Sequence, residues 1–172
     1  ISAVPLLESV QAKVILYDEN TKLSKEQVRE KLEEGSKARI VLGVLSEEML
    51  RTLDLVVLSP GVPTDIPIVE SFKKRGIPVW GEIELAYRLS KGRVVAITGT
   101  NGKTTTTTLV GKLMENYFDS VFVVGNIGKP YTKAANQMNE DTVTVAEISS
   151  FQLETIEEFH PVVSAILNIT PD

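Results

Sequence analysis

The feature that most constrains the fold is an alternation of short apolar runs with helical segments along the whole chain. Apolar residues dominate segments such as 13–18, 54–59 and 93–98, and few polar residues interrupt them. Strands that are apolar on both faces are typical of parallel sheets covered by helices on both sides. Between these runs lie segments such as 24–35, which opens on a serine suited to capping a helix and closes on a glycine. The pattern predicts an α/β protein.

The alternating segments form two successive sets of predicted strands and helices, with a boundary near Lys91 and Gly92. We expect two three-layer units with parallel sheets: a Rossmann-like N-terminal domain over residues 1–92, and a truncated P-loop ATPase-like domain over residues 93–172. A doubly wound unit normally opens with a strand that lies in the middle of its sheet. Here residues 1–10 resemble the helix that follows such a strand. We therefore expect the first sheet to lack a central strand and the segment to fold poorly alone.

Composition excludes several classes of function. The 172 residues include no cysteine and one histidine, His160, so no disulfide, thiol nucleophile or His/Cys metal cluster is expected. The net charge is −5 and no basic cluster stands out, which argues against nucleic acid as a partner. No apolar run reaches the roughly 18 residues of a membrane span, and no signal-peptide pattern is present. We expect a cytoplasmic monomer without a membrane partner.

The strongest motif is Thr-Gly-Thr-Asn-Gly-Lys-Thr at residues 98–104, between a predicted strand and a predicted helix. Glycines let successive N–H groups face a phosphate, and the helix N-terminus adds partial positive charge. In such a loop the lysine reaches the β- and γ-phosphates and the threonine hydroxyl binds Mg²⁺. The usual pattern has four residues between its glycines, whereas this loop has two, so it is a shortened variant. The predicted nucleotide-binding residues are Gly99, Thr100, Asn101, Gly102, Lys103, Thr104 and Thr105.

The predicted helix begins with five threonines, residues 104–108, although threonine is a mediocre helix former. We expect Thr104 to be a metal ligand, its neighbours to supply capping hydroxyls, and Thr106–Thr108 to pack against the sheet. A glycine-rich turn with a solvated lysine is the alternative.

Four other strand ends carry candidate residues, because ligands of open parallel sheets bind at the carboxyl ends of the strands. Glu147 ends an apolar run, and its carboxylate can hold Mg²⁺ together with Thr104. Asn126 lies in a Gly-Asn-Ile-Gly turn, where a substrate contact and a plain turn are equally compatible with the pattern. Asp18 is either a ribose-binding acid or a turn residue. The Ser59-Pro60-Gly61 loop could approach a ligand through its backbone.

With these residues identified, the chain resembles the Mur ligase family, and within it the D-glutamate-adding branch. The resemblance covers the whole segment and rests on DLVVLSPGVP, GEIEL, ITGTNGKTTT, GNIGKP, AEISSFQLE and ILNITPD, in that order. It implies a three-domain cytoplasmic enzyme of peptidoglycan synthesis that uses ATP and Mg²⁺. The small-molecule substrates would be UDP-N-acetylmuramoyl-L-alanine and D-glutamate, joined through an acyl phosphate. On this view residues 1–92 hold the UDP substrate and residues 93–172 are the first part of the ATP-binding domain.

The resemblance also implies roles for single residues. Lys103 and Glu147 would be catalytic, and Thr104 and Glu147 would be the metal ligands. The residues facing the UDP substrate would be Asp18, Ser59, Gly61, Asn126, Ser149 and Phe151. The family's diphosphate loop, carbamylated lysine and third domain have no counterpart in the segment, which we expect to be inactive alone.

Three other functions stay open. The first is a ligase of the same family that adds a different residue, including the folylpolyglutamate synthase type. The second is a non-catalytic nucleotide-binding module such as a GTPase-like switch, although the Asn-Lys-x-Asp pattern that reads guanine is absent. The third is a dehydrogenase, which lacks support because the chain has no Gly-x-Gly-x-x-Gly.

Overall fold

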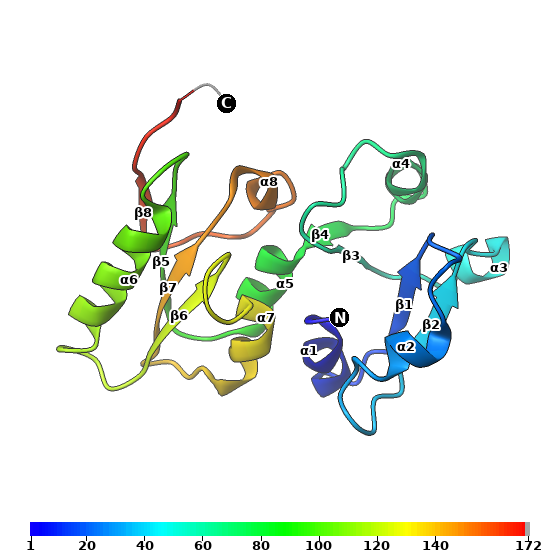
Figure 1. The fold of residues 1–172 in the computed structure, drawn as a ribbon, viewed down its shortest axis with the longest axis horizontal. Coiled ribbons are helices and arrows are strands. Elements are labelled where there is room, and N and C mark those ends of the chain that lie inside the picture. The colour runs from blue at the N-terminus through cyan, green and yellow to red at the C-terminus, as the bar shows by residue number, and fades with distance from the viewer. Residues whose placement is uncertain (171–172) are drawn as a thin grey trace.

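The computed structural model describes residues 1–170 and shows an α/β fold built on parallel sheets (Figure 1). Residues 93–170, here called the C-terminal half, contain a four-stranded sheet in the order β6-β7-β5-β8. Its strands are β5 (Arg93–Thr98), β6 (Val121–Gly125), β7 (Val143–Glu147) and β8 (Val163–Ile166). Its helices are α6 (Lys103–Met114), α7 (Tyr131–Ala134) and α8 (Ser150–Leu153), with a 3₁₀ turn η1 (Ala135–Gln137).

Both faces of this sheet are covered, as the apolar runs predict. All five residues of β7 are buried, and β7 lies between β5 and β6. Side chains that alternate along β5 and β7 enter different clusters: Ala96 and Ala146 pack towards α5 and α7, whereas Ile97 and Val145 pack towards α6. Figure 1 shows α6 on one side of the sheet and α7 on the other.

Residues 1–92, here called the N-terminal half, contain two separate parallel pairs of strands. The first pair is β1 (Ile15–Asp18) with β2 (Arg39–Leu42), and the second is β3 (Val56–Leu58) with β4 (Val79–Gly81). The helices are α1 (Val4–Ser9), α2 (Lys25–Arg29), α3 (Glu47–Leu50), α4 (Pro67–Lys74) and α5 (Glu82–Leu89). Within the described residues no strand joins the pairs, in agreement with the expected missing central strand.

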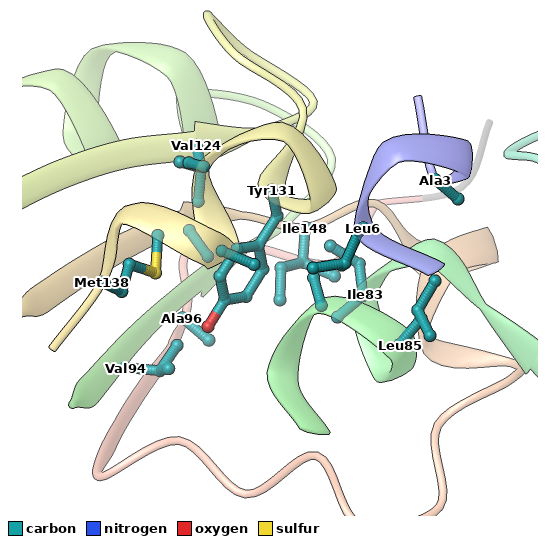
Figure 2. Close-up of a cluster of buried hydrophobic side chains, with 14 residues drawn as sticks. Ala3, Leu6, Ile83, Leu85, Val94, Ala96, Val124, Tyr131, Met138 and Ile148 are labelled. Atoms are coloured by element: carbon teal, nitrogen blue, oxygen red, sulfur yellow. The ribbon is translucent and has the colours of Figure 1, made fainter. Parts of the chain in front are cut away.

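The two halves share one apolar core, shown in Figure 2. Leu6 of α1 and Ile83 of α5 pack beside Tyr131 of α7 and Ile148, which directly follows β7. Leu6 is fully buried in this cluster. The C-terminal helix of the N-terminal half is therefore part of the packing that covers the larger sheet.

The elements differ from the sequence prediction in two places. The helix predicted for residues 24–35 ends at Arg29, although its predicted start is confirmed by a capping box between Ser24 and Gln27. Beyond Arg29 the N–H groups of Lys31 and Leu32 bond carbonyl oxygens three residues earlier, and the guanidinium of Arg29 donates to the carbonyl oxygens of Ser36 and Ala38, which fixes the returning chain. The short helix α8 was not predicted.

No helix among residues 1–170 is both long and apolar enough to cross a membrane. Residues 171 and 172, which end the ILNITPD motif and the predicted second domain, lie outside the described residues.

Candidate nucleotide-binding site

The Gly-rich loop lies between β5 and α6 and leaves the start of the helix open. Gly99 and Gly102 have φ angles of +144° and +83°, so both use backbone conformations that favour glycine. Gly102 is the N-cap of α6 and supplies no side-chain cap. In the described part of the chain, the N–H groups of Lys103, Thr104 and Thr105 have no protein acceptor. Three donors at a helix N-terminus form a favourable site for an anion.

Lys103 is folded back over the loop. Its Nζ donates to the carbonyl oxygens of Gly99, at 2.6 Å, and Thr100, at 3.1 Å. The ammonium group thus lies against the loop that precedes α6. Neutral carbonyl groups are weaker partners for an ammonium than phosphate oxygens are. A phosphate can therefore draw Nζ away from them.

The hydroxyl of Thr104 and the carboxylate of Glu147 meet across the carboxyl edge of the sheet. Thr104 Oγ1 donates to Glu147 Oε2 at 2.9 Å, and Asn126 Nδ2 approaches Glu147 Oε1 at 3.4 Å. Glu147 is only 2% exposed. Its neighbours in the parallel register are Ile97 and Gly125, so the ends of three strands converge on this carboxylate.

The pair fits a magnesium ion. Mg²⁺ binds hard oxygen ligands at about 2.1 Å in octahedral geometry, so two adjacent ligands lie about 3.0 Å apart. Thr104 Oγ1 and Glu147 Oε2, at 2.9 Å, already have that separation. No group of three or more Asp, Glu, His or Cys side chains within residues 1–170 could hold a metal by itself. An ion bound here would need further oxygen ligands, such as those of phosphate and water.

Asn168, which was not predicted from the sequence, holds the Gly-rich loop in place through hydrogen bonds. Asn168 Oδ1 accepts from the N–H of Asn101 and its Nδ2 donates to the carbonyl oxygen of Asn101, both at 2.9 Å. The backbone oxygen of Asn168 also accepts from the N–H of Thr100 at 3.2 Å. The available signal was the position of Asn168 just after β8, the strand that lies beside β5. Two amide groups predicted to bind phosphate are thus already occupied by protein.

The predicted role of the threonines as helix caps is wrong. No threonine side chain caps α6. Thr108 Oγ1 bonds the carbonyl oxygen of Thr104 within the helix, and Thr107 is fully buried, so among Thr106–Thr108 the packing prediction holds for Thr107. The free N–H groups, rather than the extra hydroxyls, distinguish this helix start.

Three of the remaining predicted site residues lie in the N-terminal half, apart from this cluster. Asp18 is exposed at the end of β1, and its Oδ1 accepts from the N–H of Asn20 in a local turn. Ser59 and Gly61 are exposed in the loop after β3. Within residues 1–170 no hydrogen bond joins these three residues to the loop or to Glu147.

Ser149 and Phe151 follow Glu147 directly. Ser149 forms a capping box with Gln152 at the start of α8. Phe151, in the first turn of α8, is 70% exposed. The structure therefore presents the ring of Phe151 to solvent and uses Ser149 as a cap.

Comparison with known proteins matches both halves of the chain. The model of the Mur ligase middle domain matches residues 97–172, and that of the MurD-like N-terminal domain of Mur ligases matches residues 1–81. The UDP-N-acetylmuramoylalanine--D-glutamate ligase of Lachnospira eligens is 61% identical over all 172 residues, and that of Lachnoclostridium phytofermentans is 60% identical. The enzyme of the same name from Thermoanaerobacter pseudethanolicus is 50% identical over 174 aligned residues.

The chain spans 38% of the length of each of these relatives. Both family models describe Mur ligases, they follow one another in the order of the chain, and together they include the Gly-rich loop, Glu147 and the Ser59-Pro60-Gly61 loop. The chain therefore belongs to the Mur ligase family.

Proposed function

We propose that this chain is part of an ATP-dependent ligase that adds D-glutamate to UDP-N-acetylmuramoyl-L-alanine during peptidoglycan precursor synthesis. The observation that carries the proposal is the pairing of Thr104 with Glu147 at 2.9 Å, beside the open N-terminus of α6 and Lys103. The names of the relatives supply the substrate pair. We also propose a domain boundary at residues 92/93, a cytoplasmic location and a monomeric state.

In the proposed site the triphosphate of ATP lies at the start of α6. The free N–H groups of residues 103–105 bind phosphate oxygens, and Lys103 moves from the loop carbonyls to the β- and γ-phosphates. Thr104 and Glu147 would hold Mg²⁺, which would neutralise part of the phosphate charge. Asn126 orients the Glu147 carboxylate through its amide.

The small number of hydrogen-bond donors to the Glu147 carboxylate supports a cation site. A carboxylate has about four acceptor positions. Among residues 1–170, only the Thr104 hydroxyl and the more distant Asn126 side-chain amide donate to the Glu147 carboxylate, although Glu147 is almost fully buried. A buried charge without an opposite charge is costly, so a bound cation would stabilise this arrangement.

The proposed ligation has two steps. An oxygen of the alanine carboxylate attacks the γ-phosphorus, the bond to the bridging β–γ oxygen breaks, and ADP leaves with an acyl phosphate formed. The unprotonated amine of D-glutamate then attacks the acyl carbon, inorganic phosphate leaves, and the nitrogen loses a proton to solvent. Lys103 and the α6 N–H groups offset the negative charge of two anionic reactants. The residues proposed to contact the UDP substrate are Asp18, Ser59, Gly61, Asn126, Ser149 and Phe151.

The test uses the full-length protein that contains this segment. Phosphate release is measured with UDP-N-acetylmuramoyl-L-alanine and each of a panel of amino acids, with ATP and then GTP as the nucleotide. We expect release that requires D-glutamate and ATP. Dependence on another amino acid would assign a different ligase of the family, and GTP-selective binding without turnover would support a switch.

Lys103→Ala tests the site itself. We expect loss of ligase activity with an unchanged circular dichroism spectrum, because Lys103 carries the only cation among the residues predicted to bind nucleotide. Lys112→Ala, an exposed lysine in the last turn of the same helix, is the matched control and should retain activity. Turnover near the wild-type rate in Lys103→Ala would contradict the assignment.

A further inference from the structure

A second buried carboxylate, Glu84 on α5, lies outside the nucleotide site. Its side chain is fully buried. Oε2 accepts from the N–H groups of Glu157 and Phe159, and Oε1 accepts from the N–H of Glu158, at 2.9 to 3.0 Å. Arg88 Nε donates to Oε1 at 2.6 Å. Four donors thus fill the acceptor positions of one carboxylate, and three of them are consecutive backbone amides of the other half of the chain.

Arg88 extends this contact. Its Nη2 pairs with the carboxylate of Glu157 and its Nη1 with that of Glu158, both at 3.0 Å. Its guanidinium carbon lies 4.1 Å from the ring centroid of Trp80, whose Nε1 also donates to Glu157. Stacking and forked hydrogen bonds both fix the plane of the guanidinium. Arg88 and Glu84 together form what we call the α5 clamp.

The clamp holds residues 154–160, which connect α8 to β8. Further contacts from the N-terminal half reach the same segment: Tyr87 Oη donates to the carbonyl oxygen of His160, and Thr64 Oγ1 to Glu154. The N–H of Gly81 donates to the carbonyl oxygen of Thr155 at 3.4 Å, and a Cβ at Gly81 would collide with the Thr155 side chain. Apart from one bond between Glu154 N and Phe151 O, the hydrogen bonds that the structure describes for residues 154–160 go to residues 64–88.

This segment continues directly from the candidate site. Glu147 ends β7, Ile148 bonds the backbone of Ile97, and Ser149 and Phe151 open α8. One end of residues 147–160 is therefore fixed in the nucleotide-binding half, and the other end is fixed by α5 of the half proposed to bind the UDP substrate.

We propose that Glu84 is a positioning residue: through the α5 clamp it sets how the UDP-substrate half is aligned with the ATP site. The proposal rests on the proposed function, because it presumes that the two halves bring together two reactants. Glu84 and Arg88 contact residues 157–159 and Trp80 rather than the residues proposed to bind the reactants. Their effect is on the distance between the acceptor carboxylate and the γ-phosphate.

The charge of Glu84 suits this role. Burial alone raises the pKa of its carboxyl group, but the hydrogen bonds from the amides of residues 157–159 and from Arg88 outweigh burial and hold the pKa below its ordinary value. The side chain is therefore an anion at neutral pH, and the amides that face it keep their acceptor.

Glu84→Gln is the test, made in the full-length protein. A glutamine has the same shape, but its NH₂ would face either N–H donors or the guanidinium. We expect kcat for ligation to fall by about 100-fold, the loss that a displacement of about 1 Å can cause. The Kd for ATP, measured by calorimetry, should stay within about twofold, because the residues proposed to bind ATP all lie in the C-terminal half.

Glu70→Gln is the matched control, since Glu70 also pairs with a basic residue four positions later but is exposed on α4. Its kinetics should equal those of the wild type. If kcat of Glu84→Gln is unchanged, or if ATP affinity falls in step with kcat, Glu84 has no positioning role. Where Glu84→Gln does not fold, Arg88→Lys keeps the charge and loses the forked contact. The same separation of kcat from Kd is expected there, and a wild-type kcat overturns the proposal.

Hydrogen exchange separates this proposal from the proposed function. In Glu84→Gln the amides of residues 154–160 should exchange faster than in the wild type, while those of β7 keep their protection. That measurement needs no ligase activity. A wild type without D-glutamate-dependent phosphate release would refute the proposed function, whereas unchanged exchange in residues 154–160 would refute the clamp.

Discussion

Gly125 is the position where a single methyl group should disturb the proposed metal site most directly. It ends β6, pairs in register with Glu147, and has a φ of +109°. A Cβ built on Gly125 would lie 2.1 Å from the carbonyl oxygen of Glu147, whereas real Cβ atoms stay at least 3.0 Å away. In Gly125→Ala the ends of β6 and β7 must therefore separate by about 0.9 Å, the difference between these distances.

Two energy terms follow from this geometry. A left-handed backbone costs a residue with a Cβ about 1–2 kcal/mol. The bond from Asn126 N to Glu147 O, now 3.0 Å, would lengthen beyond hydrogen-bonding range and leave a buried acceptor unpaired, at about 1–3 kcal/mol. Gly125→Ala should thus lose about 2–5 kcal/mol of local stability. Gly76→Ala is the control, because Gly76 has a φ of +72° with open space around its would-be Cβ, and should lose only the first term.

Hydrogen exchange of peptides covering β6 and β7 measures these local free energies in the full-length protein, where global unfolding need not be two-state. We expect a larger loss of protection in Gly125→Ala than Gly76→Ala causes around its own position. A displaced Glu147 should also raise the Mg²⁺ concentration needed for half-maximal activity, whereas Gly76→Ala should leave that concentration unchanged. Equal losses in the two variants would show that the strands absorb the methyl group without moving, and would refute the reasoning.

Three further predictions concern single side chains. Glu147→Ala should raise the half-saturating Mg²⁺ concentration at least about tenfold, because it removes one of two protein ligands; an unchanged magnesium titration would leave Glu147 a structural role. Asn168→Ala should weaken ATP binding in calorimetry, because the loop loses both amide bonds to Asn101, while Asn116→Ala, at the end of α6, should not. Because the pKa of Glu84 is lowered on folding, its contribution to stability is present above its unfolded pKa of about 4.3 and is lost as pH falls through the folded value. Protection of residues 154–160 should therefore decrease in the wild type as the pH falls below this unfolded value, and should depend less on pH in Glu84→Gln.

The convergence of Thr104 and Glu147 could be predicted from the sequence because it depends on one general rule. Parallel strands end at the same edge of a sheet, so a loop after one strand and a carboxylate at the end of another must meet there. The apolar alternation also predicted the α/β class and the parallel sheets, because a strand buried on both faces leaves a continuous apolar run.

The hydrogen bonds from Asn168 to the Gly-rich loop, the fully paired carboxylate of Glu84 and the contacts that Arg29 makes beyond α2 could not be predicted. Each depends on a contact with a backbone group whose position is set by tertiary structure: the amide of Asn101, the amides of residues 157–159, and the carbonyl groups that Arg29 reaches. A backbone amide or carbonyl group carries no signature in the sequence, so a side chain that binds one resembles any exposed polar residue. The prediction of threonine caps was wrong for a related reason, since a run of threonines does not show where their hydroxyl groups point.

The contrast between the two buried glutamates accounts for how an acidic chain would bind the proposed anionic reactants. Glu84 and Glu147 are the buried carboxylates among the described residues, and both are at most 2% exposed. Four protein donors saturate Glu84, so it has no capacity left for a metal. Glu147 has two neutral donors, one of them at 3.4 Å, and therefore retains acceptor positions and an uncompensated charge. Sequence position makes the two residues look alike, because each lies in a short motif beside an apolar segment. The number of donors to each carboxylate distinguishes the two roles: Glu84 fixes the backbone of residues 157–159, whereas Glu147 is suited to a cation. A cation at Glu147 would place positive charge next to the phosphates regardless of the net charge of −5.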